Sequence, residues 1–397
     1  MRGIIIALAV LVITLGMAPH TSPYYIETDD TTVLSTLEIR HQLPGAISAD
    51  LTPQQARALE RRGIAVEPVG LYHVTHHRPG HERGGGGNDN GGDDGDDGSD
   101  DDTTRSCTPT QQEPWGVSRV GGSGEGEGIT VAVLDTGVMQ EHLDLTQRIT
   151  DCHTTVTRFR PDTRSCEDGH GHGTHVAGTV LADAGADGQG IWGVAPQANL
   201  MAVKVCDRRG NCYGDDIAAG IQWAADNGAD IISMSLGGTQ LSSHEHNAIT
   251  HATEKGLIII ASAGNSGSDI NTIRYPAADS RVISVAATDN TDRVADFSSR
   301  GVNDNVFKIE NRYLELSAPG VSVESAHTDG CYRSSSGTSM AAPHVAGLAA
   351  KYWSQNSEKT ASDVREQLWD LTEDITDGTH ARQGYDPASG LGLPVLN

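Results

Sequence analysis

Lysine and aromatic residues are both scarce in this chain of 397 residues. Only five lysines occur, and aromatic residues make up 4% of the sequence. Clusters of basic residues that could neutralise phosphates are missing, so we expect no nucleic-acid partner. Hydrophobic residues still account for 37% of the chain, which predicts a core of aliphatic side chains and alanine. That core belongs to one large domain with appendages or to two ordinary domains.

Positive charge as a whole is in short supply, because 28 basic residues face 53 acidic ones and give a formal net charge of −25. Residues 88–102 hold eight aspartates, and subtracting these eight charges still leaves −17 for the rest of the chain. Abundant aspartate with scarce lysine is typical of adaptation to high salt, which screens repulsion between like charges. We therefore favour a halophilic source, with an ordinary acidic exported protein as the alternative.

The apolar run near the N-terminus is too short for a comfortable membrane span. Arg2 precedes this run, which covers residues 4–17 and ends among small residues typical of a cleavage site. The pattern predicts a secretory signal over residues 1–18, and hence a secreted, extracellular protein without stable membrane association. Because Pro19 is a poor residue after a cleavage site, a retained membrane anchor is the alternative.

No pair of cysteines has the CxxC spacing of a metal or redox site. Six cysteines in an exported chain instead predict disulfide bonds. Two pairs bracket short turns and are predicted to form local bridges, which leaves a third pair far apart in the sequence. The predicted pairs are Cys206–Cys212, Cys152–Cys166 and, as the remaining pair, Cys107–Cys331.

Composition divides the chain into segments. Residues 19–77 read as a small α+β domain, in which Thr52 and Pro53 are typical of the start of a helix. Residues 78–106 are rich in glycine and aspartate without apolar periodicity, which predicts a disordered linker. Residues 107–397 form the third segment, the candidate for the large domain.

Apolar strands alternate with helices after residue 107. Nearly continuous apolar strands separated by helices predict a mainly parallel sheet covered on both faces, hence a three-layer α/β/α domain. In such domains, sites form beyond the carboxyl ends of the strands. The expected strands are 129–135, 200–205, 231–236, 257–262 and 282–287, and the expected helices are 172–182, 215–227, 242–255, 339–352 and 362–371.

Three short motifs carry the residues of an activated nucleophile. Asp135 lies in LDTG, His172 in GHGTHVAG and Ser339 in GTSMAAPH. A serine hydroxyl is a weak nucleophile at neutral pH, so it needs a neighbouring base, and the base needs a carboxylate that orients it. The chain order Asp, His, Ser is one of the few in which such triads occur.

A fourth residue can supply a hydrogen-bond donor for the oxyanion. Asn265 follows the apolar strand at 257–262, where its side-chain amide can point beyond the end of the sheet. Attack on a carbonyl generates a negatively charged oxygen that a preorganised donor must stabilise. An ordinary turn residue is the alternative interpretation of Asn265.

Together, VAVLDTGV, GHGTHVAGT, SAGN and GTSMAAPHVAG resemble the motifs of the subtilisin family of serine endopeptidases, over residues 111–396. The resemblance implies that Asp135 orients His172, that His172 is general base and then acid, and that Ser339 is the nucleophile. Asn265 and the Ser339 N–H then form the oxyanion hole. The implied function is a secreted endopeptidase that cleaves proteins through an acyl-enzyme. The alternatives are a catalytically silent peptide-binding protein on this scaffold and a processing protease of narrow specificity.

The resemblance also implies that a peptide substrate binds as an added strand. Arg274 stands where a close family pattern has glycine, at the floor of the main specificity pocket. Pointing inward, Arg274 would shrink the pocket and favour acidic or small side chains; pointing outward, it would leave the pocket broad. The implied substrate-binding segments, opposite the turn at 206–213, are Ser235, Leu236, Gly237 and Gly238 together with Ala263 and Gly264.

A structural calcium ion is a further implication. Gln111, Asp144 and Asp187 match side-chain ligands of the family, and Gln189 and Ile191 match carbonyl ligands. Calcium accepts such mixed sets of oxygen atoms. The loop that carries Asp187 is longer than a common family form, so solvated acidic loops are the alternative.

Residues 19–77 resemble the second half of the inhibitory propeptide that such proteases carry. The resemblance implies a helix over 51–62 and a last strand over 64–74, whose tail lies in the active site as a product. We expect first self-cleavage between residues 72 and 77 and trimming before Gln111. The expected partners are protein substrates and the chain's own propeptide, as inhibitor and chaperone, with the mature enzyme a monomer.

Overall fold

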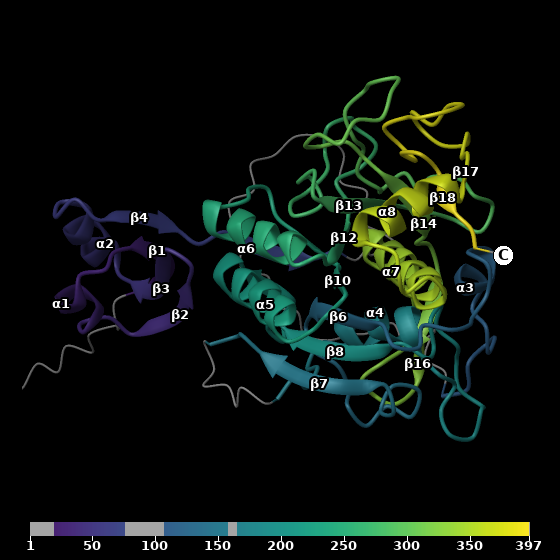
Figure 1. Cartoon of the computed structure of the whole chain (residues 1–397), viewed down its shortest axis with the longest axis horizontal. Coiled ribbons are helices and arrows are strands. Elements are labelled where there is room, and N and C mark those ends of the chain that lie inside the picture. The colour runs from purple at the N-terminus through teal and green to yellow at the C-terminus, as the bar shows by residue number, and fades with distance from the viewer. Residues whose placement is uncertain (1–19, 76–106, 158–164, 397) are drawn as a thin grey trace, which may run out of the picture.

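The computed structural model describes residues 20–75, 107–157 and 165–396 (Figure 1). A small domain at the left of Figure 1 comprises most of the first of these ranges, and the large domain comprises the other two. The predicted signal at 1–18 and the predicted linker at 78–106 lie outside the described residues. None of the helices in the described ranges is long and apolar enough to cross a membrane.

The small N-terminal domain is an antiparallel sheet of four strands with two short helices. Its apolar core includes Ile26, Leu51 and Leu59. The helix α2 begins where the sequence predicts, because Thr52 and Gln55 form a reciprocal capping box. In chain order the elements are β1 (Ser22–Glu27), α1 (Thr31–Leu34), β2 (Ile39–Leu43), β3 (Ala46–Leu51), α2 (Pro53–Glu60) and β4 (Ala65–Pro68), with strand order β2-β3-β1-β4.

The single strand expected over residues 64–74 is wrong, since this segment forms two strands in different sheets. β4 ends at Pro68, which has no N–H to continue a ladder. After Gly70, β5 (Leu71–Val74) pairs with strands of the large domain instead. The chain thus leaves the small domain as an extended segment lying on the large one.

Seven strands of the large domain form one sheet in which all pairings are parallel. The order across the sheet is β14-β13-β12-β10-β6-β8-β7. Its strands are β6 (Thr130–Asp135), β7 (Ile149–Thr154), β8 (Asn199–Lys204), β10 (Ile231–Met234), β12 (Ile258–Ser262), β13 (Val282–Thr288) and β14 (Leu316–Pro319). The edge strands β7 and β14 are absent from the sequence prediction, because neither contains a long apolar run.

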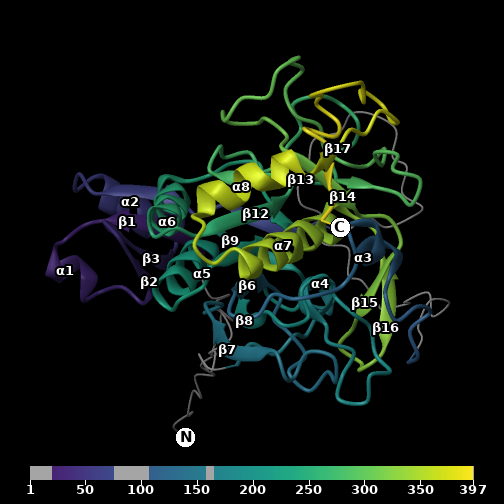
Figure 2. The ribbon, with the colours of Figure 1, turned by 45° about the vertical axis from the view of Figure 1, so that its right-hand side comes forward.

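Helices cover both faces of this sheet, which confirms the predicted three-layer fold (Figure 2). Along β6, Val131 and Val133 pack into the core that holds residues of α4 and α7, whereas Ala132 and Leu134 pack into the core that holds residues of α5 and α6. The helices are α3 (Trp115–Arg119), α4 (His172–Leu181), α5 (Gly214–Asp226), α6 (Ser243–Glu254), α7 (Thr338–Gln355) and α8 (Ala361–Asp370).

Short strands and disulfides complete the large domain. β9 (Asn211–Tyr213) and β11 (Leu236–Gly237) flank β5, and the remaining strands form two small antiparallel pairs. These pairs are β15 (Val323–Ala326) with β16 (Tyr332–Ser335) and β17 (Thr372–Glu373) with β18 (Leu393–Pro394). The three predicted disulfides are confirmed: Cys107–Cys331, Cys152–Cys166 and Cys206–Cys212.

Candidate active site

The carboxyl ends of the central strands and the start of two helices meet at one edge of the sheet. Asp135 is the last residue of β6, and Asn265 follows the end of β12 by three residues. His172 is the first residue of α4, and Ser339 lies in the first turn of α7. The parallel sheet therefore brings together residues from four separate sequence segments.

Asp135 and His172 form a buried pair. His172 Nδ1 lies 2.8 Å from Oδ1 and 3.0 Å from Oδ2 of Asp135. Because a carboxylate can only accept, Nδ1 carries the proton in the neutral ring, and Nε2 is then the basic nitrogen. The side chains of Asp135 and His172 are 0% and 4% exposed, so the ring has little freedom to turn away.

Asp168 holds this part of α4 in place, and sequence reasoning missed it. Its Oδ1 accepts the N–H groups of His170 and Gly171, both at 2.9 Å, and its Oδ2 accepts the Thr174 N–H at 3.0 Å. Burial opposes its charge, but these hydrogen bonds prevail and lower the pKa of Asp168. An aspartate shortly before a helix is a capping signal that could have identified it.

The Ser339 hydroxyl lies against the end of the N-terminal segment. Its Oγ donates to the Ser235 carbonyl at 3.1 Å and lies 2.6 Å from Thr75 Oγ1. The Ser235 hydroxyl in turn donates to the Ser339 carbonyl at 2.8 Å. Ser339 is therefore fixed to the segment that follows β10 and touches a residue from the N-terminal part of the same chain.

Asn265 presents an amide donor toward the same region. Its Oδ1 accepts the Thr338 N–H and the Thr338 hydroxyl, both at 3.0 Å. Since the Thr338 N–H can only donate, the carbonyl oxygen must face it, and Nδ2 must face the other way. Nδ2 is buried and has no hydrogen-bond partner within the described residues. A buried donor of this kind is suited to an oxygen that gains negative charge during a reaction.

The strand β5 lies between the segment expected to bind substrate, which includes β11, and the opposite turn, which includes β9. Leu236 and Gly237 of β11 pair antiparallel with Val74 and His73, and Asn211–Tyr213 of β9 pair with Leu71–His73 on the other side. The Thr75 N–H then donates to the Ser235 carbonyl at 3.2 Å. Backbone pairing of this type accepts an extended peptide whatever its side chains.

Gly238 directly follows β11, and Ala263 and Gly264, also expected to bind substrate, directly follow β12. Gly238 exchanges backbone hydrogen bonds with Tyr275, and its lack of a side chain leaves room for the ring of Tyr72. The Ala263 carbonyl accepts the Arg274 N–H at 2.9 Å, which places Arg274 beside this segment. Gly264 has a φ of 102°, a conformation that favours glycine.

Two further histidines in the motifs, His175 and His344, are buried against backbone carbonyl groups. His175 Nε2 lies 3.0 Å from the carbonyl oxygens of Val323 and Arg333, and burial lowers the pKa of His175 to about 3. His344 Nδ1 lies 2.8 Å from the Met340 carbonyl, and burial lowers the pKa of His344 to about 4. Both rings are neutral at the pH of ordinary function.

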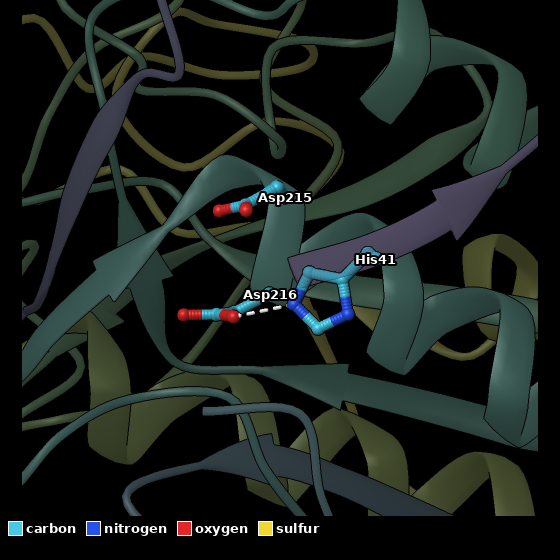
Figure 3. Close-up of side chains that lie close together, drawn as sticks. All are labelled: His41, Asp215 and Asp216. Carbon is cyan, nitrogen blue, oxygen red and sulfur yellow. Dashed lines mark hydrogen bonds and ion pairs between the residues drawn. The ribbon is translucent and has the colours of Figure 1, made fainter. Parts of the chain in front are cut away.

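A second contact joins the small domain to α5 through charged side chains (Figure 3). Arg40 Nε donates to Asp215 at 2.7 Å, and Arg40 Nη2 donates to Asp216 at 3.2 Å. His41 reaches from β2 to α5, where its Nε2 lies 2.7 Å from Asp216. Burial, together with the charge of Asp215, raises the pKa of Asp216 to about 6. His41 and the two carboxylates are close enough to hold a metal ion, but the Arg40 guanidinium already compensates their charge.

Two of the residues named for calcium converge on one glycine. A Cβ built on Gly185 would lie 3.2 Å from Asp144 Oδ1 and 3.5 Å from Asp187 Oδ1. The other Asp144 oxygen accepts the Ile191 N–H at 3.0 Å and the Tyr332 hydroxyl at 2.9 Å. Carboxylate oxygens are hard ligands, and two of them beside the same small space suit calcium.

The remaining residues of that set lie around the same loop. The Gln189 N–H donates to Asp187 Oδ1 at 3.0 Å and closes the turn. Gln111 is exposed, and the hydrogen bond from this segment to the loop comes from its neighbour, since Gln112 Nε2 donates to the Gly188 carbonyl at 2.6 Å.

Comparison with known proteins identifies the family. Residues 126–386 match the Subtilase family. The chain is similar to a subtilisin of Bacillus sp. (strain TA39), with 44% identity over 307 residues that cover 72% of this chain and 73% of that protein. It is also similar to subtilisin DY of Bacillus licheniformis, with 40% identity over 262 residues that cover 66% of this chain and 89% of that protein. The fold is also similar to the solved structure of sphericase, with a TM-score of 0.70 and 44% sequence identity. The matched region covers 72% of this chain and 99% of the sphericase chain. The chain therefore belongs to the subtilase family and is a subtilisin-like serine endopeptidase.

Proposed function

We propose that this chain is a secreted endopeptidase, made as a zymogen that cuts itself, with Asp135, His172 and Ser339 as its catalytic triad. One observation carries the proposal. A peptide segment of the chain itself, β5, pairs with the strands on both sides of the cleft and ends with Thr75 Oγ1 2.6 Å from Ser339 Oγ. The cleft thus accepts an extended polypeptide and directs it to the nucleophile.

In the proposed reaction, Ser339 Oγ attacks the carbonyl carbon of the scissile bond while His172 Nε2 takes its proton. Asp135 keeps the ring in the required tautomer and stabilises its positive charge. The Asn265 amide and the Ser339 N–H stabilise the oxyanion of the tetrahedral intermediate. Collapse of this intermediate breaks the C–N bond, and His172 gives its proton to the leaving amine. Water then attacks the acyl-enzyme while His172 takes its proton, and His172 returns a proton to Ser339 Oγ as the acid product leaves.

The small domain is the propeptide in this proposal. Its tail lies in the cleft in the orientation of a cleavage product. The bond cut first is therefore the one after Thr75, which falls within the interval expected from the sequence. Until the domain leaves, β5 excludes substrates from β9 and β11. The same domain covers the N-terminal end of α5 through Arg40, which supports a chaperone role during folding.

Calcium belongs to the proposal as a stabilising ion rather than a reagent. Asp144 and Asp187 would hold it with carbonyl groups of Gln189 and Ile191, and the Gln111 segment lies beside the same loop. Bound calcium neutralises the carboxylates and rigidifies the loop. Chelation should lower the Tm of the mature enzyme, and Asp187→Asn should remove most of that dependence. Asp151→Asn, at an exposed acid on β7, is the control and should respond to chelator as the parent does.

The nucleophile is tested by labelling with a fluorophosphonate probe, together with hydrolysis of casein. The parent should be labelled and active, and Ser339→Ala should show neither property. Ser336→Ala, at a neighbouring serine, should behave as the parent. Failure to label correctly processed protein would favour the silent peptide-binding alternative and overturn the proposal.

A further inference from the structure

The stem of Arg274 fills the space between the two walls of the cleft. A Cβ built on Gly264 would lie 2.6 Å from Arg274 Cγ, and one built on Gly237 would lie 3.0 Å from Arg274 Cβ. Gly237 and Gly264 belong to the two wall segments, so the arginine stem passes directly between them. This arrangement resolves the alternatives left open by the sequence, since the side chain points inward.

The guanidinium end of Arg274 lies beside the oxyanion residue. Arg274 Nε donates to Ser266 Oγ at 2.7 Å, and Ser266 directly follows Asn265. The side chain is therefore held against the segment that follows Asn265. A long aromatic side chain would have to displace this stem to enter.

The cavity that Arg274 borders has a volume of about 190 Å³ and a positive lining. Arg312 contributes a second guanidinium, held over the Tyr275 ring at 5.6 Å. The other lining residues, among them Thr239 and Ser266, are neutral, and no carboxylate lines this cavity in the described part of the chain. A cavity with two cationic groups and no acid favours a negatively charged occupant.

The docked N-terminal segment indicates which substrate side chain meets this charge. A Cβ on Gly237 would lie 3.2 Å from Thr75 Cγ2, as well as 3.0 Å from Arg274 Cβ. The side chain of the residue before the scissile bond and the arginine stem thus approach the same glycine. Threonine is short, and a longer side chain at this position would extend along the stem toward the guanidinium.

We propose that Arg274 makes this enzyme selective for an acidic side chain, above all glutamate, immediately before the scissile bond. This inference rests on the proposed function, because it concerns the substrate of the same site. The Arg274 stem shortens the pocket and excludes large aromatic side chains, while its guanidinium donates hydrogen bonds to a carboxylate. Small residues such as threonine also fit the shortened pocket, but they gain no electrostatic stabilisation from the guanidinium.

The test compares reporter peptides that differ only at the residue before the cleaved bond, with the mature enzyme titrated by the fluorophosphonate probe. Glutamate and glutamine have nearly the same shape, so their ratio isolates the charge. We expect glutamate to exceed glutamine by about 10- to 100-fold in kcat/KM, the scale of a hydrogen bond between charged groups. Phenylalanine should be cleaved most slowly, and the ratio of glutamate to glutamine should fall as salt increases.

Two variants separate charge from size. Arg274→Met keeps a stem in the pocket, so phenylalanine should remain slow while the ratio of glutamate to glutamine falls to about one. Arg274→Gly opens the pocket, so phenylalanine should become the fastest substrate. If the labelled, active parent already cleaves the phenylalanine peptide faster than the glutamate peptide, this inference is wrong and the proposed function stands. If the protein is neither labelled nor active on any of the peptides, the proposed function fails, and this inference fails with it.

Discussion

The small domain contacts the large domain in two chemically different ways. At the cleft, β5 uses backbone hydrogen bonds to β9 and β11, which any extended peptide can form. At α5, Arg40 forms a bidentate ion pair with buried carboxylates, which requires these particular side chains. The backbone pairing at the cleft is therefore independent of the side chains of β5, whereas the ion pair is specific to this domain.

The two contacts also differ in their electrostatic balance. The backbone pairing of β5 is neutral and leaves no charge behind when the segment departs. Asp215 and Asp216 are 0% and 1% exposed while Arg40 is bound, so their desolvation opposes docking and the guanidinium offsets it. We infer that the charged contact contributes selectivity, and the cleft contact contributes the competition with substrates.

We expect the largest effect from a substitution in the active site that leaves both contacts between the domains intact. Asn265→Ala removes the buried donor but touches neither β5 nor Arg40. We expect kcat for peptide hydrolysis to fall by about 10²–10³-fold, the loss known for the equivalent change in a subtilisin, with KM nearly unchanged. Steady-state kinetics of the mature enzyme measure this. Thr338→Ala, which loses only a hydroxyl that orients Asn265, should show a smaller decrease, and an unchanged kcat in Asn265→Ala would remove that residue from the reaction.

Breaking the charged contact should release the small domain. Arg40→Ala leaves two buried carboxylates without their guanidinium, which typically costs about 2–5 kcal/mol at an interface. After self-cleavage, the dissociation constant of the small domain should therefore rise by about 30-fold or more, measured by its co-elution with the large domain. The kcat of the released enzyme should not change. Arg57→Ala, at an exposed arginine on α2, is the matched control, and equal retention in both variants would contradict the role of Arg40.

We expect the smallest effect from a change at Glu245, which lies between the two contacts. Glu245 lies against Gly214 at the start of α5, and burial raises its pKa to about 7. A raised pKa means that its contribution to stability is complete below pH 4.5 and is lost as the pH rises through about 7. Glu245→Gln imitates the neutral form and keeps the capping box of α6.

The effect of Glu245→Gln is measured while both contacts between the domains are intact. In the Ser339→Ala precursor, Glu245→Gln should stabilise the protein by about 1–3 kcal/mol at pH 8 and change little at pH 5. Thermal unfolding at the two pH values measures the difference. Glu358→Gln, at an exposed acid beyond α7, should shift Tm equally at both pH values. The same response for Glu245→Gln would show that its charge is not the cause.

The sequence predicts the centre of the molecule better than its edges. Asp135, His172 and Ser339 lie in long motifs, and the apolar runs of β6, β10 and β12 predict buried parallel strands. The edge strands β7 and β14 escape prediction because an edge strand is short or half exposed and has no continuous apolar run.

Contacts between segments far apart in the sequence could not be predicted in the same way. Nothing in the local sequence of Arg40 indicates that it meets α5, since the two segments are 175 residues apart. The direction of the Arg274 side chain depends on the absence of a Cβ at Gly237 and Gly264, which only the folded cleft brings together. The break between β4 and β5 likewise follows from docking, because β5 pairs only with strands of the large domain.

In the proposed maturation, the segment ending at Thr75 is the product of Ser339 acting on its own chain. Intact-mass measurement and N-terminal sequencing of the parent and of Ser339→Ala show where each chain is cut. We expect a cut after Thr75 in the parent and an uncut chain in the variant. A cut after Thr75 in both proteins, or a parent cut only at other bonds, would contradict it.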